Sequence, residues 1–189
     1  MFDLIISNFA RHINLSQEET DYTLPLFTQR IVKKRTVLLS AGEICRVVYF
    51  VNKGCLRLYQ IDQEGTDHVI SFFPEDWWAV DIESFYNHSP AAYYIDALED
   101  TEVLILSYEN QAKLYEHVPK FERFFRVLTQ NGFILYQRQI MQNLSNTAEE
   151  RYKMFRKRYP NLEHRIAQKD IAAYLGITPV FVSVLRKRL

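Results

Sequence analysis

Residues 168–188, QKDIAAYLGITPVFVSVLRKR, are the most informative stretch of this sequence. Five apolar residues stand where two short helices would close a small core: Ile171, Leu175, Ile177, Val182 and Leu185. Gly176 stands where the chain must reverse, and Thr178 and Pro179 are residue types that favour an N-cap and a first helical position. The pattern predicts a helix-turn-helix whose second helix enters the major groove of DNA; an ordinary αα-hairpin is the alternative.

Charge is unevenly distributed along the chain. The 189 residues have no net charge, with 23 Lys+Arg and 23 Asp+Glu. Residues 1–143 hold 13 basic and 19 acidic residues, whereas residues 144–189 hold 10 and 4. A basic terminal segment is a candidate phosphate-binding surface, although a solvated charged face would have the same composition.

Several classes of protein are disfavoured by composition and motifs. Two cysteines are too few for a disulfide framework or an iron–sulfur cluster. The chain has no nucleophile elbow, phosphate loop or paired-histidine motif, so we expect no catalytic residue, no metal site and no cofactor. Asp3 stands where a signal peptide would be basic, and no apolar run approaches the ~20 residues that span a bilayer. These features predict a cytoplasmic protein without a membrane partner.

The middle of the chain has the pattern of an antiparallel β-domain. After a short helical lead-in over residues 1–25, β-rich runs extend from about residue 36 to residue 107. Gly42, Gly54 and Gly65 separate these runs at intervals of 12 and 11 residues. Short strands at such spacing with glycine turns indicate a sandwich or barrel.

Residues 118–143 are predicted to form a long helix with two neighbouring apolar rows. One row is Phe121, Leu128 and Leu135, and the other is Val127, Ile134 and Met141. One row would cover the β-domain and the other a partner helix, so we expect a homodimer; a single wide stripe within one chain is the alternative. The polar break before Thr147 then marks a third part. The expected domains are residues 1–117, the dimerisation helix 118–143, and the helix-turn-helix domain 144–189.

This order of parts resembles the bacterial Crp/Fnr regulators, the cyclic-AMP receptor protein family. The matching residues are Ala41-Gly42-Glu43, Tyr49-Phe50-Val51, Gly54 and Arg57 in the barrel, and Tyr174 to Pro179 in the terminal hairpin. The resemblance implies an α+β protein with a cyclic-nucleotide-binding-type antiparallel β-barrel, jelly-roll-like, a long dimerisation helix, and a winged-helix-like helix-turn-helix domain. It also implies double-stranded DNA, a second copy of the chain and RNA polymerase as partners.

The β-domain departs from the nucleotide-binding members of that family. Their Arg-Ser pair, which holds the cyclic phosphate, falls on Ala91 and Ala92, and no Lys or Arg lies between Arg57 and Lys113. A buried phosphate needs charged or amide donors, so we expect no response to cyclic AMP. The candidate pocket for an unidentified, uncharged small ligand comprises Trp77, Trp78, Asp81, Glu83, Phe85, Ala91, Ala92 and Tyr93; a purely structural core is the alternative.

The second helix of the hairpin departs from the family as well. Three positions that read bases through arginine and glutamate hold Pro179, Val180 and Val184, which make no side-chain hydrogen bond. Apolar side chains can contact the thymine methyl group, and DNA shape can add specificity. The remaining predicted contacts are Gln168, Lys169, Thr178, Ser183, Arg186, Lys187 and Arg188. The alternative function is a degenerate regulator whose apolar hairpin, with Phe181, binds protein.

Overall fold

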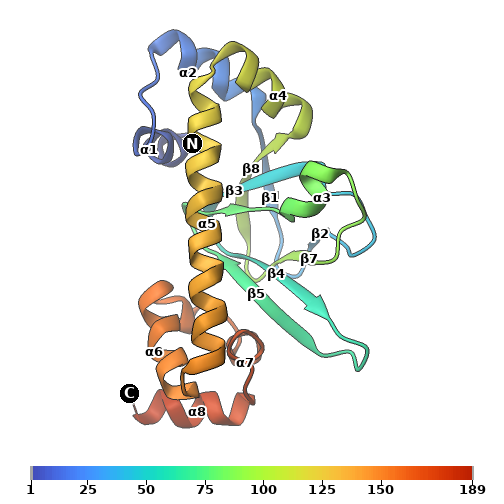
Figure 1. Ribbon diagram of the computed structural model, residues 1–189, viewed down its shortest axis with the longest axis vertical. Helices are drawn as coiled ribbons and strands as arrows, with labels where there is room; N and C mark the ends of the chain where they lie inside the picture. Colours follow the sequence, from blue (N-terminus) through green and yellow to red (C-terminus); the bar gives the residue numbers. More distant parts are fainter. Residues whose placement is uncertain (1, 189) are drawn as a thin grey trace.

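The computed structural model describes residues 2–188, in which one long helix runs beside a β-domain and a group of C-terminal helices (Figure 1). Two short helices, α1 (Asp3–Ala10) and α2 (Gln17–Thr23), and a 3₁₀ turn, η1 (Leu24–Leu26), precede the first strand. Ser16 and Glu19 form the capping box that starts α2, because each side chain bonds the backbone N–H of the other.

The β-domain consists of two four-stranded antiparallel sheets. One has the order β1 (Thr28–Val32), β8 (Thr101–Ser107), β3 (Val47–Lys53) and β6 (Trp78–Ala79). The other has the order β2 (Val37–Leu39), β7 (Tyr94–Ala97), β4 (Leu56–Ile61) and β5 (Asp67–Phe73). A short helix, α3 (Ile82–Asn87), connects them between β6 and β7. The predicted antiparallel β-domain is therefore confirmed.

An aromatic cluster fixes the N-terminal helices against the first sheet. Phe9 of α1 makes edge contacts with Phe121 and Phe124 at centroid distances of 5.0 and 5.1 Å. Trp78 lies next to the same rings and donates its indole N–H to Asn8. Burying aromatic rings in such numbers stabilises the junction of α1, the sheet and the long helix.

The long helix is α5 (Lys120–Ser145), preceded by α4 (Tyr108–His117). It ends two residues beyond the predicted boundary. Its two apolar rows differ in exposure: Phe121 is fully buried and Leu128 packs on the β-domain core, whereas Ile134 and Met141 are 42% and 60% exposed. Phe121 therefore packs within its own chain, and contact of the other row with a partner helix stays a prediction.

The C-terminal segment folds into four helical elements: α6 (Ala148–Arg158), the 3₁₀ turn η2 (Leu162–His164), α7 (Gln168–Leu175) and α8 (Pro179–Arg188). Gly176 has a φ of +63° at the end of α7, and Thr178 Oγ1 accepts the N–H of Phe181 at the start of α8. These are the turn and the cap expected from the sequence. In residues 2–188 no helix has both the length and the apolar character needed to cross a bilayer.

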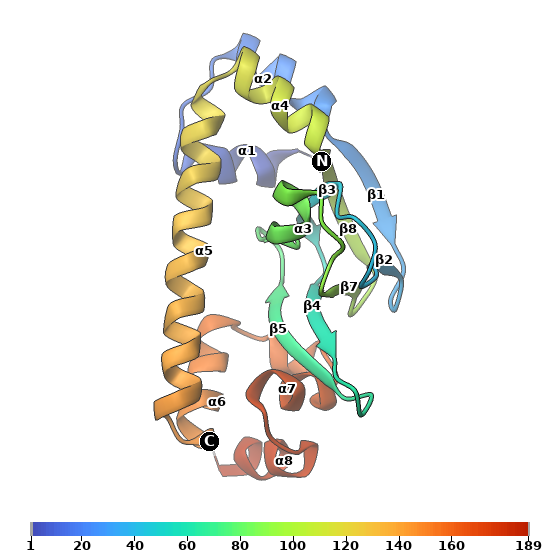
Figure 2. The ribbon, with the colours of Figure 1, turned by 45° about the vertical axis from the view of Figure 1, so that its right-hand side comes forward.

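The C-terminal helices and the β-domain share one buried core. Five residues of the β-domain belong to the same cluster as the C-terminal helices: Cys55, Tyr59, Val69, Phe72 and Leu98. From α6, α7 and α8 this cluster includes Phe155, Ile171 and Leu185. Figure 2 shows α7 directly beneath β4 and β5, with α8 on the far side of α7. The segment is thus docked on the second sheet.

Candidate nucleic-acid interface

The N-terminal half of α8 presents an apolar surface. Val180 is 75% exposed and Phe181 is 39% exposed, while Val184 is half-buried and Val182 lies in the core. Because only two side chains of this helix, Val182 and Leu185, are needed to close the core, the opposite face is free to contact another molecule. Pro179 and Thr178 are exposed at the start of the same helix. Exposed apolar groups at these positions fit contacts to thymine methyl groups.

Several of the predicted polar contacts are engaged within the hairpin. The Gln168 side-chain amide donates to Ser183 Oγ at 2.6 Å and also to the carbonyl oxygen of Pro179. Arg186 donates to the carbonyl oxygen of Glu163 at 2.9 Å. These bonds fix α7, η2 and α8 relative to one another, and they reduce the freedom of these three side chains to meet DNA.

Other basic side chains are free to approach phosphate. Lys169, Lys187 and Arg188 are all exposed, at the start of α7 and the end of α8. Cations at the last turn of α8 also interact favourably with the helix dipole. Phosphate contacts of this kind position a protein on DNA without reading its sequence.

A buried arginine joins the helix-turn-helix to the β-domain. Arg57 of β4 pairs through Nε with Asp96 at 2.8 Å, and through Nη1 with Asp67 at 2.9 Å and with Asp170 of α7 at 3.0 Å. Its guanidinium also lies 3.8 Å from the centroid of the Tyr59 ring. Burial alone would lower the pKa of Arg57, but the three carboxylates raise it above its ordinary value. Burial raises the pKa of Asp170, with the Arg57 charge acting in the opposite direction.

A second cluster lies at the edge of the same interface. Arg165, between η2 and α7, donates to Glu75 at 2.7 and 2.9 Å and to Glu99. Glu75 also accepts the backbone N–H of Gly54 at 2.8 Å. One carboxylate therefore connects the β3–β4 turn to the C-terminal helices.

Aromatic and amide contacts complete the junction. The Tyr159 ring lies edge-on to Phe72 at 5.6 Å, and its hydroxyl lies 3.4 Å from Ser71 Oγ. Gln139 of α5 donates to the carbonyl oxygen of Ile70 and accepts from Arg158. Helices α5 and α6 are thereby bonded to strand β5 and to each other.

The candidate pocket residues of the β-domain have structural partners. Phe85 lies in the core, Trp78 is half-buried against it, and Trp77 lies 5.6 Å from the Tyr159 ring. Asp81 caps α3 by accepting the N–H of Ser84, and its Oδ2 is buried without a hydrogen-bond partner. Ala91 is buried, whereas Ala92 and Glu83 are exposed and Tyr93 is half-buried. A ligand at these residues stays a prediction.

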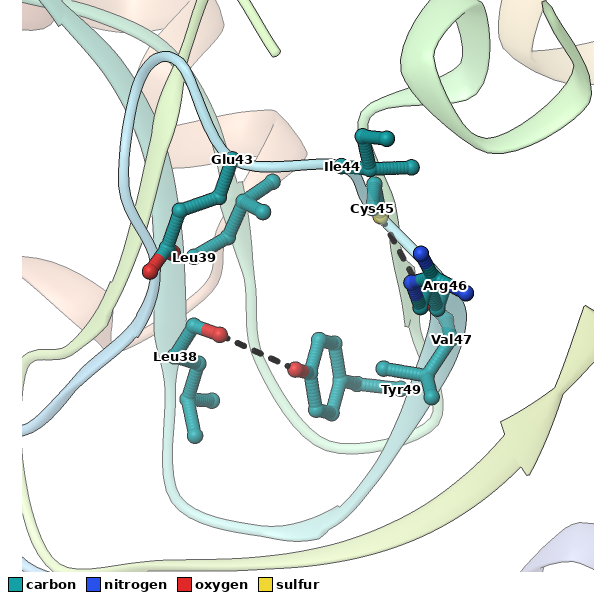
Figure 3. A pocket seen from close by; sticks show the side chains of 8 residues that line it. All are labelled: Leu38, Leu39, Glu43, Ile44, Cys45, Arg46, Val47 and Tyr49. Carbon is teal, nitrogen blue, oxygen red and sulfur yellow. Dashed lines mark hydrogen bonds between the residues drawn. The ribbon is translucent and has the colours of Figure 1, made fainter. Parts of the chain in front are cut away.

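A hollow of about 290 Å³ lies elsewhere, between β2 and β3 (Figure 3). None of the predicted pocket residues lines it; its lining is Leu38, Leu39, Glu43, Ile44, Cys45, Arg46, Val47 and Tyr49. The Tyr49 hydroxyl donates to the carbonyl oxygen of Leu38, and burial raises its pKa to about 12. The Cys45 thiol donates to the carbonyl oxygen of Val47, and burial raises its pKa as well.

Comparisons with known proteins agree with this arrangement. Residues 29–117 match the model of the cyclic nucleotide-binding domain. The anaerobic regulatory protein of Pasteurella multocida (strain Pm70) is 26% identical over 203 residues, covering 99% of this chain and 72% of its own. The fumarate and nitrate reduction regulatory protein of Yersinia pestis is 25% identical over 202 residues, covering 98% and 78%.

Solved structures share the fold over most of the chain. FixK2 from Bradyrhizobium japonicum superposes with a TM-score of 0.74 at 19% identity, covering 86% of this chain and 84% of that one. A transcriptional regulator of the Crp/Fnr family from Eubacterium rectale has a TM-score of 0.69 at 17% identity, covering 92% and 83%. The chain is therefore similar, over almost its whole length, to regulators of the Crp/Fnr family.

The matching relatives are named as regulatory proteins, and the Eubacterium rectale neighbour is described as a transcriptional regulator. The chain is accordingly a DNA-binding transcription regulator of the Crp/Fnr type. Within residues 2–188, no group of three or more His, Cys, Asp or Glu side chains is arranged to hold a metal ion.

The sequence patterns do not predict the docking of the C-terminal helices. Arg57 matches the family pattern only as a barrel residue, and no motif distinguishes Asp170, Arg165 or Glu75. One signal was present: between Arg57 and Lys113 the chain has acidic residues but no cation. Buried carboxylates there require a cation from another part of the chain.

Proposed function

We propose that this Crp/Fnr regulator binds duplex DNA as a homodimer joined through α5, and that it does so without a cyclic nucleotide. The observation that carries the proposal is an uncovered apolar stripe on α5. Phe133, Ile140 and Leu144 are 63%, 58% and 78% exposed, and Met141 beside them is 60% exposed. Such side chains recur on one face of a helix when a second helix covers them.

The stripe is well placed to pair two chains. It occupies the C-terminal half of α5, since the first turns of that helix are buried in the β-domain core. Gly132, at the start of the stripe, has no neighbouring atom within 4 Å of where a Cβ would lie. A glycine in a helix costs about 1 kcal/mol relative to alanine, and close approach of a partner helix would offset that cost.

A two-fold dimer would present two copies of α8 to one side of a DNA duplex. Recognition helices in such dimers lie about 34 Å apart, one turn of DNA. The exposed Val180 and Phe181 then favour thymine methyl groups, and Lys169, Lys187 and Arg188 supply phosphate contacts. Contact with RNA polymerase is the expectation for a regulator that activates transcription.

The β-domain does not fit a cyclic nucleotide. The positions of the family's phosphate-binding Arg-Ser pair hold two alanines, Ala91 and Ala92. Arg57, the nearest cation in the preceding sequence, is buried and fully engaged with three aspartates. An anion placed there would displace carboxylates that already satisfy this guanidinium.

Sedimentation of the full chain tests the dimer. The wild type is expected to be dimeric at micromolar concentration, and Ile140→Glu is expected to be monomeric because it places a charge inside the helix contact. Ile31→Glu is the matched control, since Ile31 is 66% exposed on β1, away from α5. A monomeric wild type, or a dimeric Ile140→Glu, would overturn the α5 assignment.

Selection of binding sites from a random DNA pool, at low and moderate salt, tests the DNA interface. We expect a two-fold symmetric site with A/T-rich half-sites and binding that weakens steeply as salt rises. Val180→Ala is expected to relax base preference while leaving the salt dependence unchanged. Lys187→Gln is expected to reduce the salt dependence while leaving base preference unchanged. Self-association that ignores salt, with no enriched site, would instead support a protein-binding hairpin. Added cyclic AMP should leave the affinity unchanged.

A further inference from the structure

The contacts between the β-domain and the C-terminal helices combine three kinds of interaction. Arg57 pairs with Asp170 across the interface, Arg165 pairs with Glu75 and Glu99 at its edge, and the Tyr159 ring is buried against Phe72 between them. Most interfaces between domains are polar and permit relative motion, unless they are extensive and apolar. Here the ion pairs surround a continuous buried core, so the DNA-binding segment and the sheet form one unit.

We propose that Arg57, Asp170 and Arg165 are positioning residues that hold the helix-turn-helix in its DNA-binding orientation, so that no small effector is needed to place α8. The proposal rests on the proposed function, because it concerns how that DNA-binding surface is oriented. In a regulator that needs an effector, the bound ligand would join the two domains. Here the three side chains would do so.

The contact between the domains leaves the recognition helix exposed, as DNA binding requires. The interface uses Asp170 at the start of α7, Arg165 before it, and Tyr159 after α6. It leaves Val180, Phe181 and the basic end of α8 uncovered, and α8 lies on the side of α7 away from the sheet (Figure 2). A contact that inhibits by masking would cover the recognition helix, and this one leaves it exposed.

The cost of separating the domains explains why the orientation is held. Arg57 has 8% of its side-chain surface exposed, and Asp170 has 7%. Rotating the C-terminal helices away would expose apolar residues of the shared core, and it would break this ion pair and the Arg165 pairs. An effector that makes fewer contacts than these would shift the equilibrium between docked and separated domains only slightly.

Distances between spin labels on the full-length protein test the orientation. The labels are attached to cysteines that replace Glu64 in the β4–β5 hairpin and Lys157 in α6, two exposed positions. The native Cys45 and Cys55 are buried. Labelled chain diluted with unlabelled chain reports the distance within one protomer. The wild type without ligand is expected to have one narrow distribution that cyclic AMP does not change, and Asp170→Asn is expected to broaden it.

Asp170→Asn also distinguishes an effect of orientation on DNA affinity from an effect of charge alone. Removing a carboxylate beside the DNA-binding surface would by itself strengthen binding to DNA. Our inference predicts the opposite: if the loosened segment keeps its orientation about a tenth of the time, affinity for the selected site falls about tenfold. Asp21→Asn, on the exposed surface of α2, is the charge-matched control and should leave affinity and distances unchanged.

Arg165→Gln is the second variant, because this half-exposed side chain can be replaced with little risk to folding. It too is expected to broaden the distances while the circular dichroism spectrum and the dimer persist. A broad wild-type distribution, or narrow distributions with unchanged affinity in both variants, would overturn the inference. A wild type that binds no DNA would defeat the proposed function, and the distances would still test the orientation.

Discussion

At the scale of single residues, two glycines with the same backbone conformation are expected to respond differently to substitution. Gly42 and Gly54 have φ values of +91° and +94°, a region that L-residues rarely adopt. A Cβ at Gly42 would meet nothing within 4 Å, whereas one at Gly54 would lie 2.8 Å from the carbonyl oxygen of Asp100 and 2.6 Å from Thr101 Oγ1. Gly42→Ala should therefore cost only backbone strain, about 1–2 kcal/mol, and Gly54→Ala clearly more.

Urea unfolding of the two variants, followed by circular dichroism, measures this difference. Equal losses in the free energy of unfolding would mean that the chain around Thr101 moves away without cost. The close approach at Gly54 matters for function as well, because the same turn donates its N–H to Glu75, the partner of Arg165.

At the scale of elements, the start of α6 depends on a local cap. The Thr147 side chain accepts the N–H of Glu150, and the Glu150 carboxylate accepts the N–H of Thr147 at 2.7 Å. Thr147→Ala is expected to lower the free energy of unfolding by about 1 kcal/mol, because an N–H of the first turn loses its acceptor. Thr129→Ala, at an exposed position within α5, is the matched control and should not destabilise the protein, since alanine is the better helix former. Thermal melting compares them, and equal melting temperatures would contradict a role for the cap.

At the scale of the whole molecule, the interface between the domains should make stability depend on acidic pH. Burial by itself would raise the pKa of Glu75, but the Arg165 guanidinium and the Gly54 N–H together bring that pKa below its ordinary value of 4.5. A carboxyl with a lowered pKa in the folded state stabilises the protein above its unfolded pKa, and this contribution disappears as pH falls through the folded pKa. We therefore expect the free energy of unfolding to decrease as the pH drops below about 4.5.

Glu75→Gln isolates this contribution. The variant should be less stable than the wild type at pH 7, and its stability should change less between about pH 4.5 and the lowest pH at which it folds. Glu116→Gln, exposed on α4, is the control. If the free energies of unfolding of wild type and Glu75→Gln change in parallel with pH, the pair with Arg165 does not stabilise the docked state.

Local patterns in the sequence were sufficient for the order of the parts. Gly176 with Thr178 and Pro179 predicted the helix-turn-helix, and the capping boxes at Ser16 and Thr147 start two helices through equally local contacts. These signals work because caps, turns and periodic apolar positions depend on residues three or four apart in the chain. The family resemblance rested on the same local motifs, and the comparisons confirmed it.

Only the tertiary structure decided how the parts are joined. Asp170 and Arg57 are separated by 113 residues, and no local pattern distinguishes that pair from the other charges on α7 and β4. The structure likewise separated the two rows of α5, placing Phe121 in the core and leaving Met141 exposed. Sequence by itself determined the order of the parts and the resemblance to a family. The docking of the DNA-binding segment depends on contacts between surfaces that folding brings together, and those follow from three-dimensional packing.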